Sequence, residues 1–285
     1  MANAALHFRF AVLLNIALYS GNLFGQWPAY ASGGPKTKDG QFDKNAPAPK
    51  TAEGTPDLSG IWDALPPGNA PGTGLGGAPP AGGGRGGGRA GGAPKRPFIS
   101  LPSVVPGGLP LQPWAAKLRA DRLANGSIEH PDAHCLPIQP VQLHSHPQPR
   151  KIVQTPGLIV IIYEANGGLR QIFTDGRALP KNDPQPWWAG YSVGKWEGDT
   201  LVVETIGFRD DLWLDEEGTP MTGNGKMTER FHRTNFGTLE IDITLDDSKT
   251  FTKPFGFKLT QHLMPDTELI EFICLENEKS AVHYK

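Results

Sequence analysis

Short apolar runs separated by turn signals fill the carboxyl-terminal half of the chain, and this pattern predicts β-strands. In residues 239–245 every second residue is Leu or Ile, and the residues between them are Glu, Asp and Thr. This period of two places the apolar side chains on one face of a strand. Turns such as Asn166-Gly167-Gly168 and Glu197-Gly198-Asp199 separate the runs. The pattern predicts eight strands, at residues 158–165, 169–174, 191–196, 200–208, 226–233, 238–245, 255–263 and 268–275.

The short connections between these strands favour an all-β fold, because a parallel crossover needs a longer connection than most of them offer. We therefore expect an antiparallel up-and-down barrel or a sandwich of about eight strands. Closure into a barrel would also remove the edge strands that promote aggregation. Before the strands, residues 113–126 (PWAAKLRADRLANG) begin with Pro and end with Asn-Gly, which predicts one short N-terminal helix.

The amino-terminal part of the chain divides into segments of different composition. Residues 1–31 resemble a secretory signal, with Arg9 before the apolar run from Phe10 to Leu18 and small residues at Ala29 and Ala31. The apolar run is too short to span a bilayer of about 30 Å, so we expect no transmembrane segment after cleavage. Residues 32–110 are expected to be a disordered Gly/Pro-rich leader with a short strand near residues 57–65, and residues 111–285 to form the β-rich domain.

Composition excludes several classes of protein. The 27 Lys and Arg residues nearly balance the 29 Asp and Glu residues, so the net charge offers no reason to expect nucleic acid as a partner. The arginines of the tract GGGRGGGRAGG within residues 66–97 are read as part of a flexible linker, since that segment holds 13 Gly and 7 Pro in 32 residues. Nothing in the sequence indicates an oligomeric state.

Two cysteines, Cys135 and Cys274, are the only ones in the chain. In a secreted or periplasmic protein two such thiols often pair. A bond between them would join the segment before the strands to the last expected strand. The alternative is two separate buried thiols that act as small apolar side chains.

Several motifs together resemble a family of secreted bacterial proteins, common in acidobacteria and other soil bacteria, most of whose members are of unknown function. The motifs are PDLSGIW (56–62), FTDGRALP (173–180), GYSVGKWEGDTLVVET (190–205), DLWLDEEGTP (211–220), TERFHR (228–233) and EFICLENE (271–278). The resemblance implies export and a shared β-rich domain, and it assigns no catalytic residue. Gly60-Ile61-Trp62 also resembles the Gly-x-Trp of the first strand in calycins, the lipocalin and avidin type of barrel.

Charged residues within the strands are the candidates for chemistry. Glu204 lies in an apolar strand, where it would be a general acid or base if it faced inward with Val202, and a solvated carboxylate if Leu201 and Val203 faced inward instead. In residues 227–234, Glu229 shares one face with Phe231, whereas the other face is polar throughout and carries Arg230 and His232. Either face can line a polar cavity, or the charges can pair across strands on the outside.

Further candidates lie at strand ends and in an aromatic region. Asp175 and Arg177 can hold a polar ligand at a cavity mouth, or simply form a tight turn. The aromatic residues between 184 and 215 include Trp188 and Trp213, which suit a sugar or a flat apolar ligand as well as a core.

His144 and His146 would share one face if that segment were extended, but a third ligand at metal-binding spacing is missing from the sequence. We therefore predict no metal and no cofactor.

These patterns support two main functional hypotheses. In the first, the barrel interior binds a small, partly apolar or glycosidic ligand. In the second, the protein is a hydrolase or lyase in which Glu204 or Glu229 acts as acid or base and Arg177 or Arg230 stabilises charge. A purely structural role is the third alternative. The sequence does not decide whether the protein is an enzyme.

Overall fold

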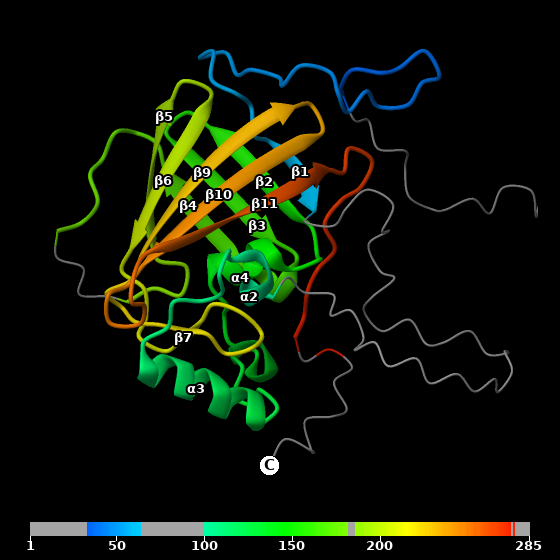
Figure 1. Cartoon of the computed structure of the whole chain (residues 1–285). Helices are drawn as coiled ribbons and strands as arrows, with labels where there is room; N and C mark the ends of the chain where they lie inside the picture. The colour runs from blue at the N-terminus through cyan, green and yellow to red at the C-terminus, as the bar shows by residue number, and fades with distance from the viewer. Residues whose placement is uncertain (1–32, 64–99, 182–185, 275, 277–285) are drawn as a thin grey trace, which may run out of the picture. The chain divides into compact units, whose positions relative to one another are not determined.

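The chain folds into a closed β-barrel (Figure 1). The computed structural model describes residues 33–63, 100–181, 186–274 and 276. Within these residues nine strands close the barrel in the order β1-β11-β10-β9-β6-β5-β4-β3-β2. Their bounds are β1 (Gly60–Asp63), β2 (Arg150–Thr155), β3 (Leu158–Tyr163), β4 (Leu169–Phe173), β5 (Tyr191–Glu197), β6 (Thr200–Ile206), β9 (Lys226–Asn235), β10 (Thr238–Asp246) and β11 (Phe255–Leu263). The all-β barrel expected from the alternating pattern is thereby confirmed.

The alternation of side chains along the strands builds the core. The apolar residues of 239–245 are at most 1 % exposed and pack inside the barrel with Phe231 and Ile161. Seven of the eight expected strands are present, with ends shifted by up to two residues. The short strand expected near residues 57–65 also forms, as β1, and it pairs with both β2 and β11. The alternating residues therefore do specify the inner face, as period-two burial requires.

The eighth expected strand, at residues 268–275, is wrong. Within the described part of that segment the chain runs outside the barrel without strand pairing. The reason is topological, since β1 already occupies the edge of β11 beside which a further strand would have to lie. The segment is instead held by a hydrogen bond from the Ile270 amide to Glu164 (3.1 Å) and by its cysteine.

One pair of strands departs from the expected up-and-down pattern. Strands β4 and β5 are parallel and share only two register pairs, Ile172 with Ser192 and Phe173 with Val193. A parallel neighbour requires the chain to return to the other end of the barrel before it starts the next strand. Residues 174–190 make this return, of which 182–185 lie outside the described residues.

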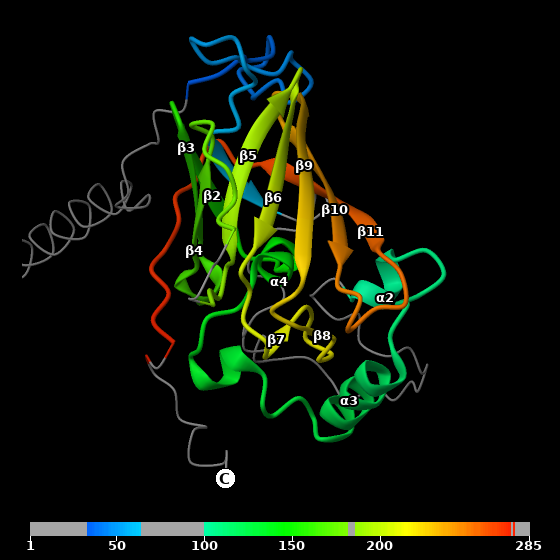
Figure 2. The same cartoon turned by 90° about the vertical axis from the view of Figure 1, so that its left-hand side faces the viewer.

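A short helix occupies the interior at one end of the barrel, which we call the closed end (Figure 2). This helix, α4 (Pro140–Ser145), is buried at all six positions. Pro at its first position and a Gln139 side chain that accepts from the Val141 amide start it. Arg150 satisfies the chain at its carboxyl end by donating to the carbonyls of His144, His146 and Gln148. His144 thus lies in a helix and His146 directly follows it, so the two do not share one face of an extended segment.

The remaining elements pack around the closed end. The expected helix forms as α3 (Pro113–Ala124), and the sequence did not predict α2 (Leu101–Val104) or α4. Short 3-10 turns, η2 (Pro131–His134) and η3 (Ala165–Gly167), and a small ribbon, β7 (Leu212–Trp213) with β8 (Pro220–Met221), complete this end. Cys135 and Cys274 form a disulfide, with their Cα atoms 5.7 Å apart.

Residues 34–58 cover the opposite, hairpin end of the barrel (Figures 1 and 2). Part of this segment was expected to be disordered, yet its backbone bonds to the β9–β10 hairpin, with Phe236 N to Ala46 O at 2.7 Å and Gly237 N to Lys44 O at 2.8 Å. The long-range partners explain the difference, because local composition does not reveal them. The expected signal at residues 1–31 and the linker at 66–97 lie outside the described residues.

Candidate functional site

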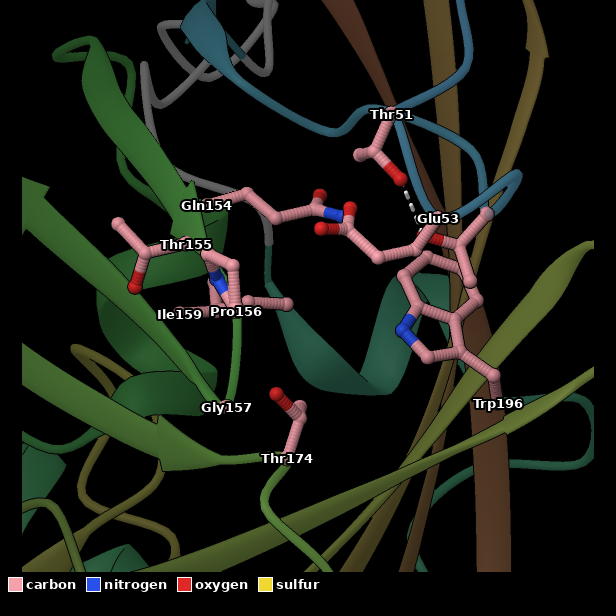
Figure 3. A pocket seen from close by; sticks show the side chains of 10 residues that line it. Thr51, Glu53, Gln154, Thr155, Pro156, Gly157, Ile159, Thr174 and Trp196 are labelled. Carbon is pink, nitrogen blue, oxygen red and sulfur yellow. Dashed lines mark hydrogen bonds between the residues drawn. The ribbon is translucent and has the colours of Figure 1, made fainter.

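A cavity of about 280 Å³ opens at the hairpin end of the barrel, and we call it the mouth cavity (Figure 3). Its wall includes the indole of Trp196, which faces inward from β5, and its inner end reaches the core residue Ile159. Other residues that line the cavity carry hydroxyl or carboxylate groups, namely Thr51, Glu53, Thr55, Thr155 and Thr174. An aromatic face within a ring of small polar groups is the arrangement that holds a polar ring by stacking and hydrogen bonding.

Residues 34–58, which we call the covering segment, are held over this cavity by hydrogen bonds. Thr51 and Thr55 close a turn through a backbone hydrogen bond of 2.8 Å and a contact of 2.9 Å between their hydroxyls. Gln154 of β2 ties the segment down, since its carbonyl accepts from the Leu58 amide (2.8 Å) and its amide donates to Pro56 (3.1 Å). The mouth cavity is therefore formed by the barrel and the covering segment together.

A second, larger cavity of about 830 Å³ lies on the outer face of β5 and β6, and we call it the outer groove. It arises because the returning chain after β4 passes over this face. Arg177 on the returning chain is held in place by Asp175, with Nε to Oδ1 at 2.9 Å and Nη2 to Oδ2 at 2.6 Å. It also donates to the Tyr191 hydroxyl and packs 3.9 Å from the centre of the Phe173 ring.

Some charged side chains of the outer groove have ion-pair partners, and one does not. Glu204 pairs with Lys226, and Glu197 pairs with Arg230 at 3.1 Å. The hydrogen bonds from Arg177 lower the pKa of Asp175, so this carboxylate is ionised as well. Lys195 lines the same groove and has no ion-pair partner among the described residues. Its ammonium, with the donors of Arg177 that remain open, makes the groove a place for an anionic group.

A third group of polar residues lies inside the barrel beside α4, and we call it the buried cluster. Arg170 of β4 binds both carboxylate oxygens of Glu229, with Nη1 to Oε1 at 2.9 Å, and both residues are at most 2 % exposed. Arg170 also donates to the hydroxyls of Ser192 (3.1 Å) and Thr205 (3.0 Å). One guanidinium thus joins four consecutive strands of the barrel, β4, β5, β6 and β9.

The fifth member of the buried cluster is His144 of α4. Its Nε2 lies 3.1 Å from Glu229 Oε1, 3.3 Å from the Tyr163 hydroxyl and 3.4 Å from Arg170 Nη1. Burial lowers the pKa of His144, so the imidazole is neutral. Burial alone would raise the pKa of Glu229, but the charge and hydrogen bonds of Arg170 outweigh it and lower that pKa to about 2.

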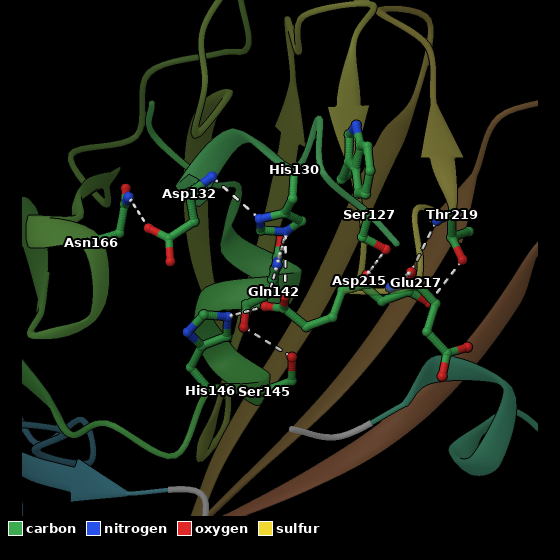
Figure 4. Close-up of polar contacts among 12 residues, drawn as sticks. Ser127, His130, Asp132, Gln142, Ser145, His146, Asn166, Asp215, Glu217 and Thr219 are labelled. Carbon is green, nitrogen blue, oxygen red and sulfur yellow. Dashed lines mark hydrogen bonds and ion pairs between the residues drawn. The ribbon is translucent and has the colours of Figure 1, made fainter. Parts of the chain in front are cut away.

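Another pair of imidazoles meets a carboxylate beneath α4 (Figure 4). His146 Nε2 lies 3.0 Å from Glu216 Oε1, and His130 Nε2 lies 3.7 Å from the other oxygen. Burial opposes ionisation of Glu216, but the His146 bond and the two imidazoles lower its pKa. Gln142 donates to the same carboxylate (2.8 Å). Across the described ranges, no three His, Cys, Asp or Glu side chains are grouped so as to hold a metal ion.

The structure separates the residues proposed from the sequence as catalytic. Leu201 and Val203 face the interior, which places Glu204 on the outer face. Glu229 faces inward, whereas Arg230 pairs with Glu197 outside and His232 contacts the Asp199 carbonyl at 3.3 Å. These four residues therefore do not line one cavity. The reason is the strict alternation of β6 and β9, which sends neighbouring charged residues to opposite sides.

The proposed ligand-binding residues are also divided. Arg177 lines the outer groove together with Glu204, and Asp175 orients it. Trp188 stacks under Arg209, with the guanidinium carbon 4.4 Å from the ring centre. Trp213 is 4 % exposed and packs between Arg122 and His130. Neither tryptophan lines the mouth cavity or the outer groove.

Sequence reasoning missed Trp196 and Arg170 as site residues. Arg170 precedes the core residue Ile172 by two positions, so the period-two rule could have placed it inside. Trp196 belongs to the aromatic residues between 184 and 215 that suit a sugar or a core, but nothing local singles it out from the other tryptophans of that region.

Comparison of the chain with protein-family models, curated proteins and solved structures finds no match. The resemblance of its motifs to secreted bacterial proteins, and of Gly60-Ile61-Trp62 to calycins, therefore remains a prediction from the sequence. Conclusions about function rest on the geometry of the cavities. A separate observation concerns membranes. No helix within the described residues has the length and apolar character needed to cross a bilayer.

Proposed function

We propose that this protein is a binding module that holds a small, partly apolar or glycosidic ligand at the mouth of its barrel. The mouth cavity carries the proposal, because it combines the indole of Trp196 with a ring of hydroxyl groups. A volume of about 280 Å³ lies at the lower end of the range for ligand sites. It suits a single ring, and a sugar ring matches both the aromatic face and the hydroxyl-rich rim.

The buried cluster speaks against a catalytic role for Glu229. A carboxylate that acts as general acid needs a pKa raised towards neutral pH and access to a substrate. Glu229 has a pKa lowered to about 2 and is 0 % exposed. The hydrolase or lyase alternative keeps Glu204 and Arg177 as its candidates, and no observed geometry favours it over binding.

The compartment is part of the same proposal. The Cys135–Cys274 disulfide is compatible with an oxidising location. Together with the signal-like residues 1–31, it supports a secreted or periplasmic protein. A binding module there would meet its ligand outside the cytoplasm.

Isothermal titration calorimetry with glucose, galactose, N-acetylglucosamine and cellobiose tests the proposal. We expect at least one of these sugars to bind, and Trp196→Ala to weaken that sugar at least tenfold because it removes the stacking surface. Trp187→Ala is the matched control, since Trp187 is 48 % exposed and lines neither cavity.

Because Trp196 packs partly against the core, Thr174→Val provides a second variant of the same cavity that leaves the indole in place. Circular dichroism verifies that each variant is folded. Lack of binding by every sugar of the panel, or an equal loss in the Trp187 variant, would overturn the proposal.

A further inference from the structure

The mouth cavity and the outer groove are neighbours across the barrel wall. Both are lined by Thr174 and Trp196. At this point of the barrel wall, β4 and β5 are no longer paired. Strand β4 ends at Phe173, and the last β4–β5 register pair is Phe173 with Val193. Beyond that pair β5 continues to Glu197 with no β4 residue beside it. We call the short parallel pairing of β4 and β5 the parallel seam. The two cavities therefore adjoin at its end.

A glycine keeps this part of the wall thin. Gly194 lines the outer groove from β5. A Cβ added there would point inward, 3.0 Å from Ile172 and 3.1 Å from Leu201 and Thr174 side-chain atoms. The wall at this position consists of main chain alone, with the interior on one side and the groove on the other.

The chemistry differs on the two sides of the seam. The mouth cavity offers an indole, hydroxyl groups and the carboxylate of Glu53. The outer groove offers Lys195 and those N–H groups of Arg177 that its ion pair with Asp175 leaves open, while its carboxylates are paired with Lys226 and Arg230. A molecule that fits both sides needs a ring for Trp196 and, further along, an anionic group for the groove.

We infer that the ligand is a short linear oligosaccharide that carries carboxylate groups, as uronic acids do. One sugar ring stacks on Trp196 in the mouth cavity, and the chain continues past Thr174 into the outer groove. There a carboxylate meets Lys195 and the open donors of Arg177. This inference rests on the proposed function and adds the length and charge of the ligand.

Calorimetric titration of galacturonic acid, trigalacturonate and the methyl ester of trigalacturonate tests it on the full chain. We expect the trimer to bind at least tenfold more tightly than the monomer and the ester, since only the free trimer fills both cavities with complementary charge. The variant Lys195→Ala with Arg177→Gln is expected to weaken the trimer at least tenfold and the monomer less than twofold. Trp196→Ala is expected to weaken both.

The control is Lys258→Ala, which removes an exposed cation of β11 that is paired with Glu240 of β10 and lines neither cavity. If the groove variant binds the trimer normally while Trp196→Ala weakens it, the extension into the groove is refuted and the proposed function stands. Equal binding of the ester and the free trimer refutes the role of the carboxylate. If Trp196→Ala changes nothing, or no sugar binds, both proposals are refuted.

Discussion

Polar side chains are buried and paired with one another at the closed end of the barrel, whereas at the mouth they border open space. At the closed end, α4 brings His144 into the interior, where Arg170 and Glu229 are at most 2 % exposed and bind each other. At the mouth, the polar side chains surround an open volume, and Trp196 is only partly buried. A buried charge is tolerated only with its partners present, whereas a binding site must keep some of its partners for the ligand. The comparison assigns a stabilising role to the buried charges, and it leaves the mouth as the end with polar groups beside open space, which is where our proposal places the ligand.

The buried cluster also explains how the barrel tolerates its parallel seam. Two register pairs between β4 and β5 contribute little backbone hydrogen bonding. Arg170 supplements them from the inside, since it starts on β4 and reaches Ser192, Thr205 and Glu229 on the next three strands. The seam can therefore stay short near the mouth, where the two cavities adjoin.

The largest effect is expected from the disulfide at the closed end. Replacing Cys135 and Cys274 together by Ser should lower the free energy of unfolding by about 4–5 kcal/mol, because the bond closes a loop with a sequence separation of 139 residues. Urea-induced unfolding followed by circular dichroism measures it. A loss below about 1 kcal/mol would show that the closed end does not depend on this bond.

The next largest loss of stability is expected when the buried carboxylate of Glu229 is replaced, and replacement of the exposed carboxylate of Glu204 is its comparison. Glu229→Gln should lower the free energy of unfolding by about 3–5 kcal/mol, because it leaves the Arg170 charge buried without its counter-ion. Glu204→Gln breaks only an ion pair whose side chains are 46 % and 44 % exposed, and it should cost about 0–1 kcal/mol. Replacing both members by Arg170→Met and Glu229→Leu should cost less than Glu229→Gln alone. Equal losses for Glu229→Gln and Glu204→Gln would show that burial of the ion pair does not decide its contribution to stability.

The pH dependence of stability should arise mainly at the closed end. The folded-state pKa of His144 lies below its usual 6.5, so as pH falls below 6.5 the unfolded chain takes up a proton first and stability falls. Glu229 acts in a lower window, where its stabilisation is complete above pH 4.5 and is lost as pH falls through 4.5 to about 2. Urea unfolding between pH 8 and 3 measures both. In Glu229→Gln the loss below pH 4.5 should shrink, and an unchanged profile would contradict the assignment.

An effect smaller than those at the closed end is expected at the mouth. Gln154→Leu removes the bonds to Pro56 and Leu58 and should cost about 1–3 kcal/mol, because it leaves a half-buried amide without its acceptor. Hydrogen exchange and limited proteolysis within residues 34–58 should rise. Gln171→Leu, on the exposed outer face of β4, is the control and should stay within about 0.5 kcal/mol of the parent. Equal proteolysis of both variants would show that Gln154 does not hold the covering segment.

Much of the barrel could be predicted from local alternation, as in residues 239–245, since burial of one face repeats with the strand period. The eighth strand could not be excluded in the same way, because its pairing depends on whether β1, 200 residues away, occupies the edge of β11. The candidate site depended even more on long-range order. Glu204 and Glu229 lie in similar strands, and only the register with neighbouring strands sends one outward and one inward. Neither cavity could be predicted, because the parallel seam and the covering segment are features of topology.

The disulfide has a topological consequence for the barrel. The bond between Cys135 and Cys274 closes a covalent ring of main chain and disulfide. This ring contains eight of the nine barrel strands, from β2 to β11, and leaves out only β1. Strand β1 lies outside this ring, so its pairing with β2 and β11 and the Leu58 bond to Gln154 have to hold it, and the residues before it, on the barrel without covalent help.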